Sequence, residues 1–213
     1  MNIVFHRMAI WIAIFVFFCY GCKSSEKPRT PELAVANLHQ ALLQDNAKAF
    51  ANCFDATPKE KDLLLALFSL MQETRDLEQA LIGAYGRESV DGKMGRQYPY
   101  AELRDENALK ETEIDRIGLD NAIVILPGGK RKIRIYEKDD SWLFPMKHMV
   151  PPFVDRASDR IAAVYQMTGV IRDARDKVGK EGQDAKTIQQ EMRIGLWQLV
   201  DEWKKQSRTS SAN

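Results

Sequence analysis

The stretch EIDRIGLDNAIVILPGGKRKIRIYEKDDSWLFP, residues 113–145, decides the fold class of this chain. Apolar residues recur in it at every second position, which is typical of strands with one buried face. Its four segments, 113–119, 122–126, 130–137 and 142–145, are separated by short runs of Asp, Asn, Pro, Gly and Lys that favour tight turns. We therefore expect an antiparallel meander of three or four strands.

Helical patterns precede this predicted sheet. The sequence TPE at 30–32 places Thr at an N-cap, Pro at the first helical position and an acid in the first turn. The sequence TPKE at 57–60 is a capping box and opens a long helix that we expect to end at Tyr85, before a glycine. Shorter helical stretches are expected over 47–54 and around 101–109.

Helical periodicity returns after the sheet. Apolar residues at 154, 157, 161, 164, 171 and 178 share one face of a helix expected over 153–178. A second helix is expected from an Asp184 cap to about Lys205, and the two predict an antiparallel hairpin. The whole chain thus predicts an α+β fold, with N-terminal helices packed on a small antiparallel meander sheet and a C-terminal helical hairpin.

The N-terminus has the parts of an export signal. Arg7 supplies a positive charge, residues 8–20 (MAIWIAIFVFFCY) are apolar or aromatic, and the small Gly21 follows. The apolar run is shorter than the roughly 20 residues that a membrane-spanning helix needs. We expect residues 1–21 to be a signal peptide and residues 22–30 to be a flexible tether.

The Gly21-Cys22 junction resembles the lipobox of bacterial lipoproteins. In that family the chain is cleaved before the cysteine, whose thiol carries diacylglycerol, so the resemblance implies cleavage after Gly21 and lipidation of Cys22. Cys19 and Tyr20 stand where the family favours Leu and a small residue. Acyl chains, contributing about 0.8 kcal/mol per buried CH₂, would hold the protein at a membrane of the cell envelope, facing the periplasm or the exterior.

Charge and cysteine content limit the possible partners and covalent links. The chain has 31 Lys plus Arg and 30 Asp plus Glu, and removal of residues 1–21 takes away only one Arg. A neutral mature chain argues against nucleic-acid binding, which needs a basic face.

If Cys22 is acylated, Cys53 is the one other thiol after residue 21, so no internal disulfide forms. We expect Cys53, beside Phe50 and Phe54, to be a small buried apolar residue.

A second resemblance covers residues 30–147. The segment TPELAVANLHQALLQDNAKAFANCFDAT, residues 30–57, resembles the opening of nuclear transport factor two-like domains, also called ketosteroid-isomerase-like or SnoaL-like, and DDSWL at 139–143 resembles a turn into a strand in that family. The matching residues are Thr30, Pro31, Glu32, Ala34, Val35, Asp45, Ala47 and Phe50. The resemblance implies a cone-like domain with an internal pocket, expected over 31–150. The hairpin at 151–206 departs from the family, and 207–213 is expected to be a disordered tail.

No motif predicts catalysis, a cofactor or a metal ion. His39 and His148 have no spacing that would form a metal pair, and we interpret His39 as a solvent-exposed or boundary residue. The sequence PGGK at 127–130 lacks the spacing of a phosphate-binding loop and predicts a hairpin turn. Three aspartates are expected in turns: Asp55, Asp139 and Asp140. Three tryptophans are expected to pack in the core or at helix edges: Trp142, Trp197 and Trp203.

Three functions remain open from the sequence. The leading one is a non-enzymatic, lipid-anchored domain that binds a small apolar ligand or a protein partner at the cell envelope. An apolar cavity would support the ligand version, and a solid interior would count against it. The second is a structural or protein-interaction module built on the C-terminal helices, which an exposed apolar stripe there would favour. The third is an isomerase- or dehydratase-like enzyme, which needs an acid or base in a closed cavity.

Overall fold

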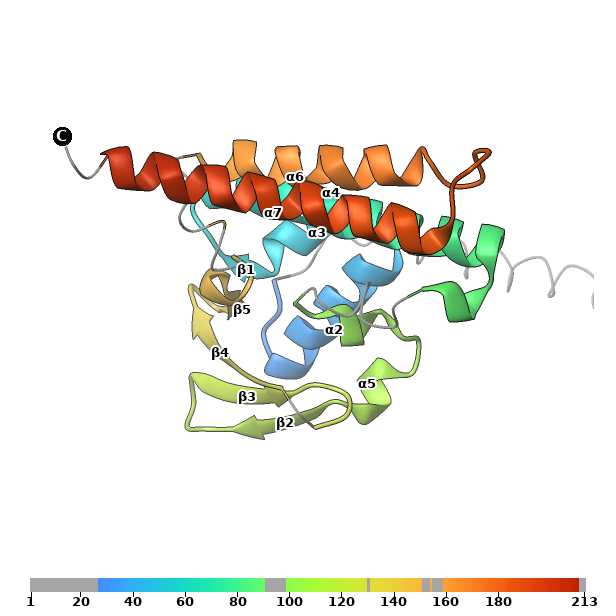
Figure 1. Ribbon diagram of the computed structural model, residues 1–213. Helices are drawn as coiled ribbons and strands as arrows, with labels where there is room; N and C mark the ends of the chain where they lie inside the picture. The colour runs from blue at the N-terminus through green and yellow to red at the C-terminus, as the bar shows by residue number, and fades with distance from the viewer. Residues whose placement is uncertain (1–26, 91–98, 130, 151–153, 155–158, 211–213) are drawn as a thin grey trace, which may run out of the picture.

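The computed structural model describes residues 27–90, 99–129, 131–150, 154 and 159–210. The predicted signal peptide, its cleavage site and the lipidation site at Cys22 lie outside the described residues. Within the described part, six α-helices and a five-stranded sheet form an α+β fold (Figure 1). The fold class predicted from the sequence is confirmed.

The N-terminal helices begin where the capping signals place them. The helix α2 (Pro31–Leu43) starts after Thr30, whose side chain accepts a hydrogen bond from the backbone N–H three residues on. The helix α4 (Pro58–Tyr85) starts with the predicted capping box, in which the Thr57 N–H donates to Glu60 at 2.8 Å. It ends at Gly86, whose φ of +86° favours glycine. Between them, α3 (Ala47–Asn52) is shorter than predicted.

The sheet has the predicted meander and one additional strand. Its strands are β1 (Phe54–Asp55), β2 (Glu113–Arg116), β3 (Asn121–Ile125), β4 (Lys132–Lys138) and β5 (Ser141–Pro145). The order is β1-β5-β4-β3-β2, and the pairs from β2 to β5 are antiparallel as predicted. The short β1 pairs parallel to β5, with Phe54 opposite Phe144, so the sheet is mixed.

An aromatic cluster packs between the sheet and the helices. It consists of Phe50, Phe54, Phe68, Tyr100 and Phe144, all buried, with contacting ring centroids 4.9–6.0 Å apart. Such tilted and edge-to-face contacts add to the stabilisation that burial gives. Within this part of the fold, protein side chains occupy the space between the sheet and α4.

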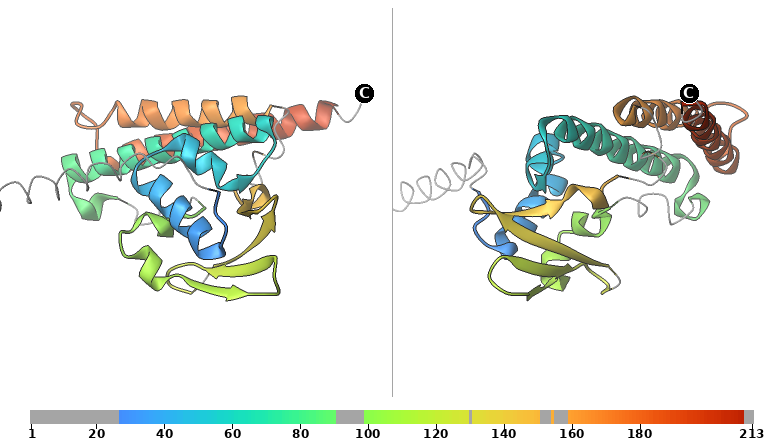
Figure 2. Two further views of the ribbon diagram at one scale, coloured as in Figure 1. Left: turned by 180° about the vertical axis from the view of Figure 1, so that it is seen from behind. Right: turned by 90° about the vertical axis from the view of Figure 1, so that its left-hand side faces the viewer.

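The C-terminal helices form a layer outside α4. The helix α6 (Arg160–Arg175) lies against α4, and α7 (Ala185–Ser210) lies against α6. Figure 2, right, shows the three helices in succession, with α7 farthest from the sheet. The predicted antiparallel hairpin is present, and α7 continues into the predicted tail. The short α5 (Ala108–Glu111) precedes β2.

The apolar run on α6 faces α4 and is not exposed. Val164 and Ile171 are buried, and so is Val154 before the helix. At the edge of this contact the Glu73 carboxylate accepts from Arg172 at 3.1 Å and pairs with Arg175 at 2.7 Å. The predicted stripe on α6 is therefore an internal packing surface.

The turn between β4 and β5 holds two non-glycine residues in the left-handed region. Asp139 and Asp140 have φ of +52° and +58°, which are the dihedrals of a two-residue hairpin turn that prefers glycine at its second position. We expect Asp140→Gly to raise the free energy of unfolding by about 0.5–1 kcal/mol, because the substitution relieves backbone strain. Urea denaturation measures the change, with Asp120→Gly, at another exposed loop position, as the control. A destabilised Asp140→Gly variant would contradict the expectation.

Candidate functional site

Two sequence-predicted residues have clear outcomes in the core. Cys53 is buried as expected, and burial raises the pKa of its thiol to about 12. His39 was expected at the surface, and this is wrong: only 6% of it is exposed. Its Nδ1 lies 2.7 Å from the Leu103 carbonyl oxygen, so this nitrogen carries the proton and donates. That hydrogen bond satisfies Nδ1 and gives His39 a structural role.

The aspartates and tryptophans divide into residues placed as expected and residues that are not. Asp139 and Asp140 form the predicted turn, but Asp55 lies in β1 and accepts hydrogen bonds from Tyr136 at 2.7 Å and Lys138 at 2.8 Å. These hydrogen bonds hold the pKa of Asp55 below its usual value.

Two tryptophans, Trp142 and Trp203, are buried as expected. The third, Trp197, is 71% exposed, so its expected packing role is wrong.

Tyr100 is a core residue that the sequence analysis missed. It is fully buried at a φ of +65°, and its hydroxyl has no hydrogen-bond partner in the described part of the chain. Burial raises the pKa of this hydroxyl. A buried polar group without a partner costs free energy.

We therefore expect Tyr100→Phe to leave the free energy of unfolding unchanged or to raise it by about 1 kcal/mol, because the substitution removes only the unsatisfied oxygen. Thermal and urea denaturation measure this effect. Tyr136→Phe is the matched control: it removes a hydroxyl that does donate, to Asp55, and should destabilise by about 1 kcal/mol. Equal losses in both variants would show that Tyr100 has a partner.

A hollow lies between the end of α4 and the first turns of α7. Its volume is about 730 Å³. The lining residues are Tyr85, Glu88, Ser89, Asp184, Ala185, Lys186, Gln189, Gln190 and Arg193. Two of the charged groups are cations and two are anions, and the hollow opens along the side of α7.

Hydrogen bonds fix the walls of this hollow. The Tyr85 hydroxyl accepts from the Gly179 N–H at 2.9 Å and donates to the Gln183 carbonyl at 3.2 Å, which holds the α6–α7 loop against the end of α4. The buried Gln189 side chain donates to the Ser89 carbonyl at 2.9 Å. The first turn of α7 is therefore held in place by the residues that end α4.

The outer side of α7 continues from the hollow as a line of exposed and half-buried residues. We call Lys186, Gln190, Arg193, Trp197, Asp201 and Lys204 the α7 stripe, because their spacing places them along one side of the helix. The Lys204 ammonium lies 6.0 Å from the centre of the Trp197 ring, close enough for a cation–π interaction. Ile194, beside the stripe, is 49% exposed. The stripe thus combines an exposed aromatic ring with charged side chains.

The opposite side of α7 packs against α6. Met192 and Trp203 are buried, and the Trp203 indole N–H donates to Gln166 at 3.1 Å. A Cβ at Gly195 would lie 3.0 Å from a methyl carbon of Val170, so glycine allows the two helices to approach closely. With this side occupied, the α7 stripe is directed away from α6.

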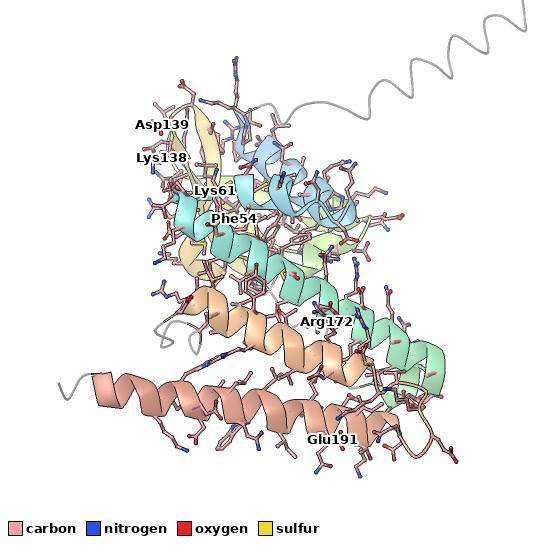
Figure 3. All side chains as sticks on the ribbon, turned by 90° about the horizontal axis from the view of Figure 1, so that it is seen from above. Phe54, Lys61, Lys138, Asp139, Arg172 and Glu191 are labelled. Carbon is pink, nitrogen blue, oxygen red and sulfur yellow. The ribbon has the colours of Figure 1, made fainter. Side chains whose placement is uncertain are left out.

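The start of the described chain lies far from α7. The Lys27 ammonium donates to the Asp139 carbonyl at 3.3 Å, and the Trp142 N–H donates to the Pro28 carbonyl at 2.8 Å. Figure 3 shows Asp139 at one side of the molecule and Glu191, on α7, at the opposite side. The right view in Figure 2 agrees, with the β4–β5 hairpin and α7 at opposite ends. The predicted tether therefore joins the domain on the side that faces away from α7.

Comparisons with known proteins add no family: no protein-family model, curated protein or solved structure matches this chain. The resemblances to the lipobox and to nuclear transport factor two-like domains stay predictions. In the described residues, His, Cys, Asp and Glu form no group of three or more suited to a metal ion. Among the described helices, none has both the length and the apolar composition needed to cross a bilayer.

Proposed function

We propose that this protein is an exported, lipid-anchored protein of the cell envelope that binds a protein partner through the α7 stripe, without catalysing a reaction. The observation that carries the proposal is the exposure of Trp197, at 71%, beside the half-exposed Ile194 on the outermost helix. Tryptophan and arginine are the residues that most often dominate the binding energy of protein interfaces. Both are present in the stripe, four positions apart.

The alternatives have weaker support. The rings of the aromatic cluster pack directly against one another from α4 to β5, which argues against an apolar ligand among them. The hollow beside α7 has two cationic and two anionic side chains in its lining and no described residue with a catalytic arrangement. Burial keeps the Cys53 thiol protonated at neutral pH, the opposite of what a nucleophile needs. A protein partner on α7 would explain why Trp197 and Ile194 are exposed there, whereas a small ligand or a substrate would not.

Chain geometry supports a partner in the space beyond the membrane. If Cys22 carries the lipid, the five residues from there to Lys27 reach at most about 17 Å. The packed helices α4, α6 and α7 lie about 8–10 Å apart from axis to axis, so α7 lies about 20 Å beyond α4. A short tether on the opposite side would keep α7 directed away from the bilayer. The stripe would then face the periplasm or the exterior.

The lipid anchor is tested by metabolic labelling with a radioactive fatty acid. We expect wild-type protein and Cys53→Ala to incorporate the label and to sediment with membranes. Cys22→Ala should lose the label and leave the membrane fraction. Equal incorporation in wild type and Cys22→Ala would overturn lipidation at Cys22. Full-length protein in the cytosol with Met1 intact would overturn export itself.

The partner-binding face is tested by placing a photo-activated cross-linking amino acid in the full-length protein, in cells that express it naturally. At position 190, where the exposed Gln190 belongs to the stripe and Trp197 is kept, we expect a discrete adduct larger than the protein alone. Position 119 is the matched control, because Leu119 is 94% exposed after β2, far from α7. The same weak background at both positions would contradict a binding role for the stripe.

A further inference from the structure

The turn between β2 and β3 carries exposed apolar side chains, and we infer that it inserts into the surface of the lipid bilayer that holds the anchor at Cys22. This inference rests on the lipid anchor of the proposed function and adds a second point of membrane contact. Leu119 is 94% exposed, more than any other large apolar residue in the described part of the chain, and Ile117 is 49% exposed. Apolar side chains at an exposed turn suit burial at the boundary between lipid headgroups and acyl chains.

Backbone hydrogen bonds hold the turn in place. The Ile117 N–H donates to the Asn121 carbonyl at 2.7 Å, which closes the loop that carries Leu119. The Asp120 carbonyl accepts from the Glu137 N–H at 2.9 Å, so the loop is also tied to β4. The exposed leucine is therefore presented by a fixed backbone, and insertion would not require the turn to unfold.

The β2–β3 turn lies at the same end of the sheet as the start of the described chain. In the antiparallel meander from β2 to β5, the first and third turns lie at one end and the second turn at the other. The third turn contains Asp139, whose carbonyl accepts from the Lys27 ammonium at 3.3 Å. The anchor expected at Cys22 is five residues before Lys27, a reach of at most about 17 Å. A lipid on Cys22 would therefore bring this end of the sheet to the bilayer surface.

Another apolar side chain lies close to the turn, on α2. Arg116, the last residue of β2, donates to both carboxylate oxygens of Glu32 at 3.1 and 2.9 Å, which holds the first turn of α2 beside the end of β2. Leu33 follows Glu32 in that turn and is 37% exposed. The exposed apolar residues at this end of the sheet thus come from two elements.

The charges at this end are nearly balanced. We define the end by residues 27–32, 115–121 and 134–140, whose cations are Lys27, Arg29, Arg116, Arg134 and Lys138. Their acids are Glu32, Asp115, Asp120, Glu137, Asp139 and Asp140. Five cations against six acids give no positive excess that would attract anionic lipid. The contact must therefore be apolar, and the charged groups beside Leu119 limit it to the headgroup region.

The small size of the apolar surface favours a bilayer over a protein partner. A stable protein interface buries about 800 Å² on each partner, which two or three side chains cannot supply. A bilayer already held by acyl chains needs no such area, because each apolar side chain that enters it adds to an existing attachment. The bilayer is also the partner that the expected lipid would place nearest to this turn.

The test places an environment-sensitive fluorophore at the tip of the turn. Full-length, lipidated Leu119→Cys is labelled at the new thiol, since Cys53 is buried, and is reconstituted into zwitterionic vesicles with a nitroxide quencher near the headgroup end of the acyl chains. We expect the emission to fall about threefold relative to vesicles without quencher. Leu109→Cys is the matched control, because Leu109 is 40% exposed but lies on α5, before the opposite end of β2. Equal quenching at the two positions, or none at 119, would overturn the inserted turn.

A second measurement asks whether the contact is apolar. Adding Ile117→Asp to the protein labelled at 119 should remove most of the quenching, whereas Leu109→Asp should not. Replacing part of the zwitterionic lipid by anionic lipid should change the quenching by less than about twofold, because the charges at this end nearly cancel. Quenching that survives Ile117→Asp, or that needs anionic lipid, would overturn apolar insertion. Equal melting temperatures of the two Asp variants show that both are folded.

Fatty-acid labelling of the same proteins separates this inference from the proposed function. Protein that carries the fatty acid but is not quenched at 119 overturns the inserted turn and leaves the anchor intact. Protein with neither fatty acid nor quenching overturns the anchor, and the inserted turn with it. Cys22→Ala labelled at 119 should lose the quenching, since a few apolar side chains hold a protein far more weakly than acyl chains do. The adduct at position 190 reports on the α7 stripe, which takes no part in this membrane contact.

Discussion

Phe50→Ala is expected to lower the free energy of unfolding by about 3–5 kcal/mol, the range for removing a large buried aromatic side chain. Phe50 is fully buried in the aromatic cluster, with its ring centroid 5.0 Å from that of Phe54 and 4.9 Å from that of Phe68. It joins α3 to both β1 and α4, so the cavity would open where three elements meet. Urea denaturation followed by circular dichroism measures the loss.

Two control variants show whether the loss of stability comes from the cavity at position 50 or from substitution in general. Phe50→Leu keeps much of the volume and should cost clearly less than Phe50→Ala. Leu119→Ala changes a side chain that is 94% exposed and should stay within about 0.5 kcal/mol of wild type. A loss below about 1.5 kcal/mol in Phe50→Ala would mean that the cluster is loosely packed and that an internal ligand site must be reconsidered.

The parts of the fold that local signals control were predictable. The capping box at 57–60 and Gly86 set both ends of α4, because their hydrogen bonds and dihedrals involve residues within one turn of each helix end. The Asp139-Asp140 turn likewise set the β4–β5 hairpin. Alternation in 113–145 gave the antiparallel order, since neighbouring strands with short turns pair with one another.

Features that depend on distant partners were not predictable. The strand β1 has two residues, too few to show any alternation, and it exists because β5 lies beside it, 90 residues later at Phe144. His39 is buried because the Leu103 carbonyl, 64 residues away, satisfies its Nδ1. Neither partner leaves a signal in the sequence around the residue itself.

The candidate site was only partly predictable for the same reason. Both Trp197 and Trp203 lie on a helix that the sequence identified. Which of them is buried depends on how α7 fits against α6. The close approach at Gly195 and the hydrogen bond from Trp203 to Gln166 fix the rotation of α7. The sequence placed the interaction stripe on α6, whose apolar run is instead covered by α4.

These two tryptophans give the second large expected effect. Trp203→Ala should lower the free energy of unfolding by about 3 kcal/mol, because it removes a buried indole and its hydrogen bond to Gln166. Trp197→Ala should change the free energy of unfolding by no more than about 0.5 kcal/mol, since 71% of that side chain is exposed. Urea denaturation of the two variants measures the difference.

For partner binding we expect the opposite order, in which substitution of Trp197 has the large effect and substitution of Trp203 the small one. With the photo-activated residue placed at 190, Trp197→Ala should lower the adduct yield about 30-fold, the effect of losing about 2 kcal/mol at an interface. Trp203→Phe, which keeps an apolar ring in the α6 contact, should leave that yield within about threefold. If Trp197→Ala destabilises the fold as much as Trp203→Ala does, the ring of Trp197 is a packing residue and the stripe loses its anchor. If both variants are stable and neither lowers the adduct yield, the partner binds another face. An interface on the stripe would lose affinity when Trp197, the largest exposed side chain of the stripe, is removed.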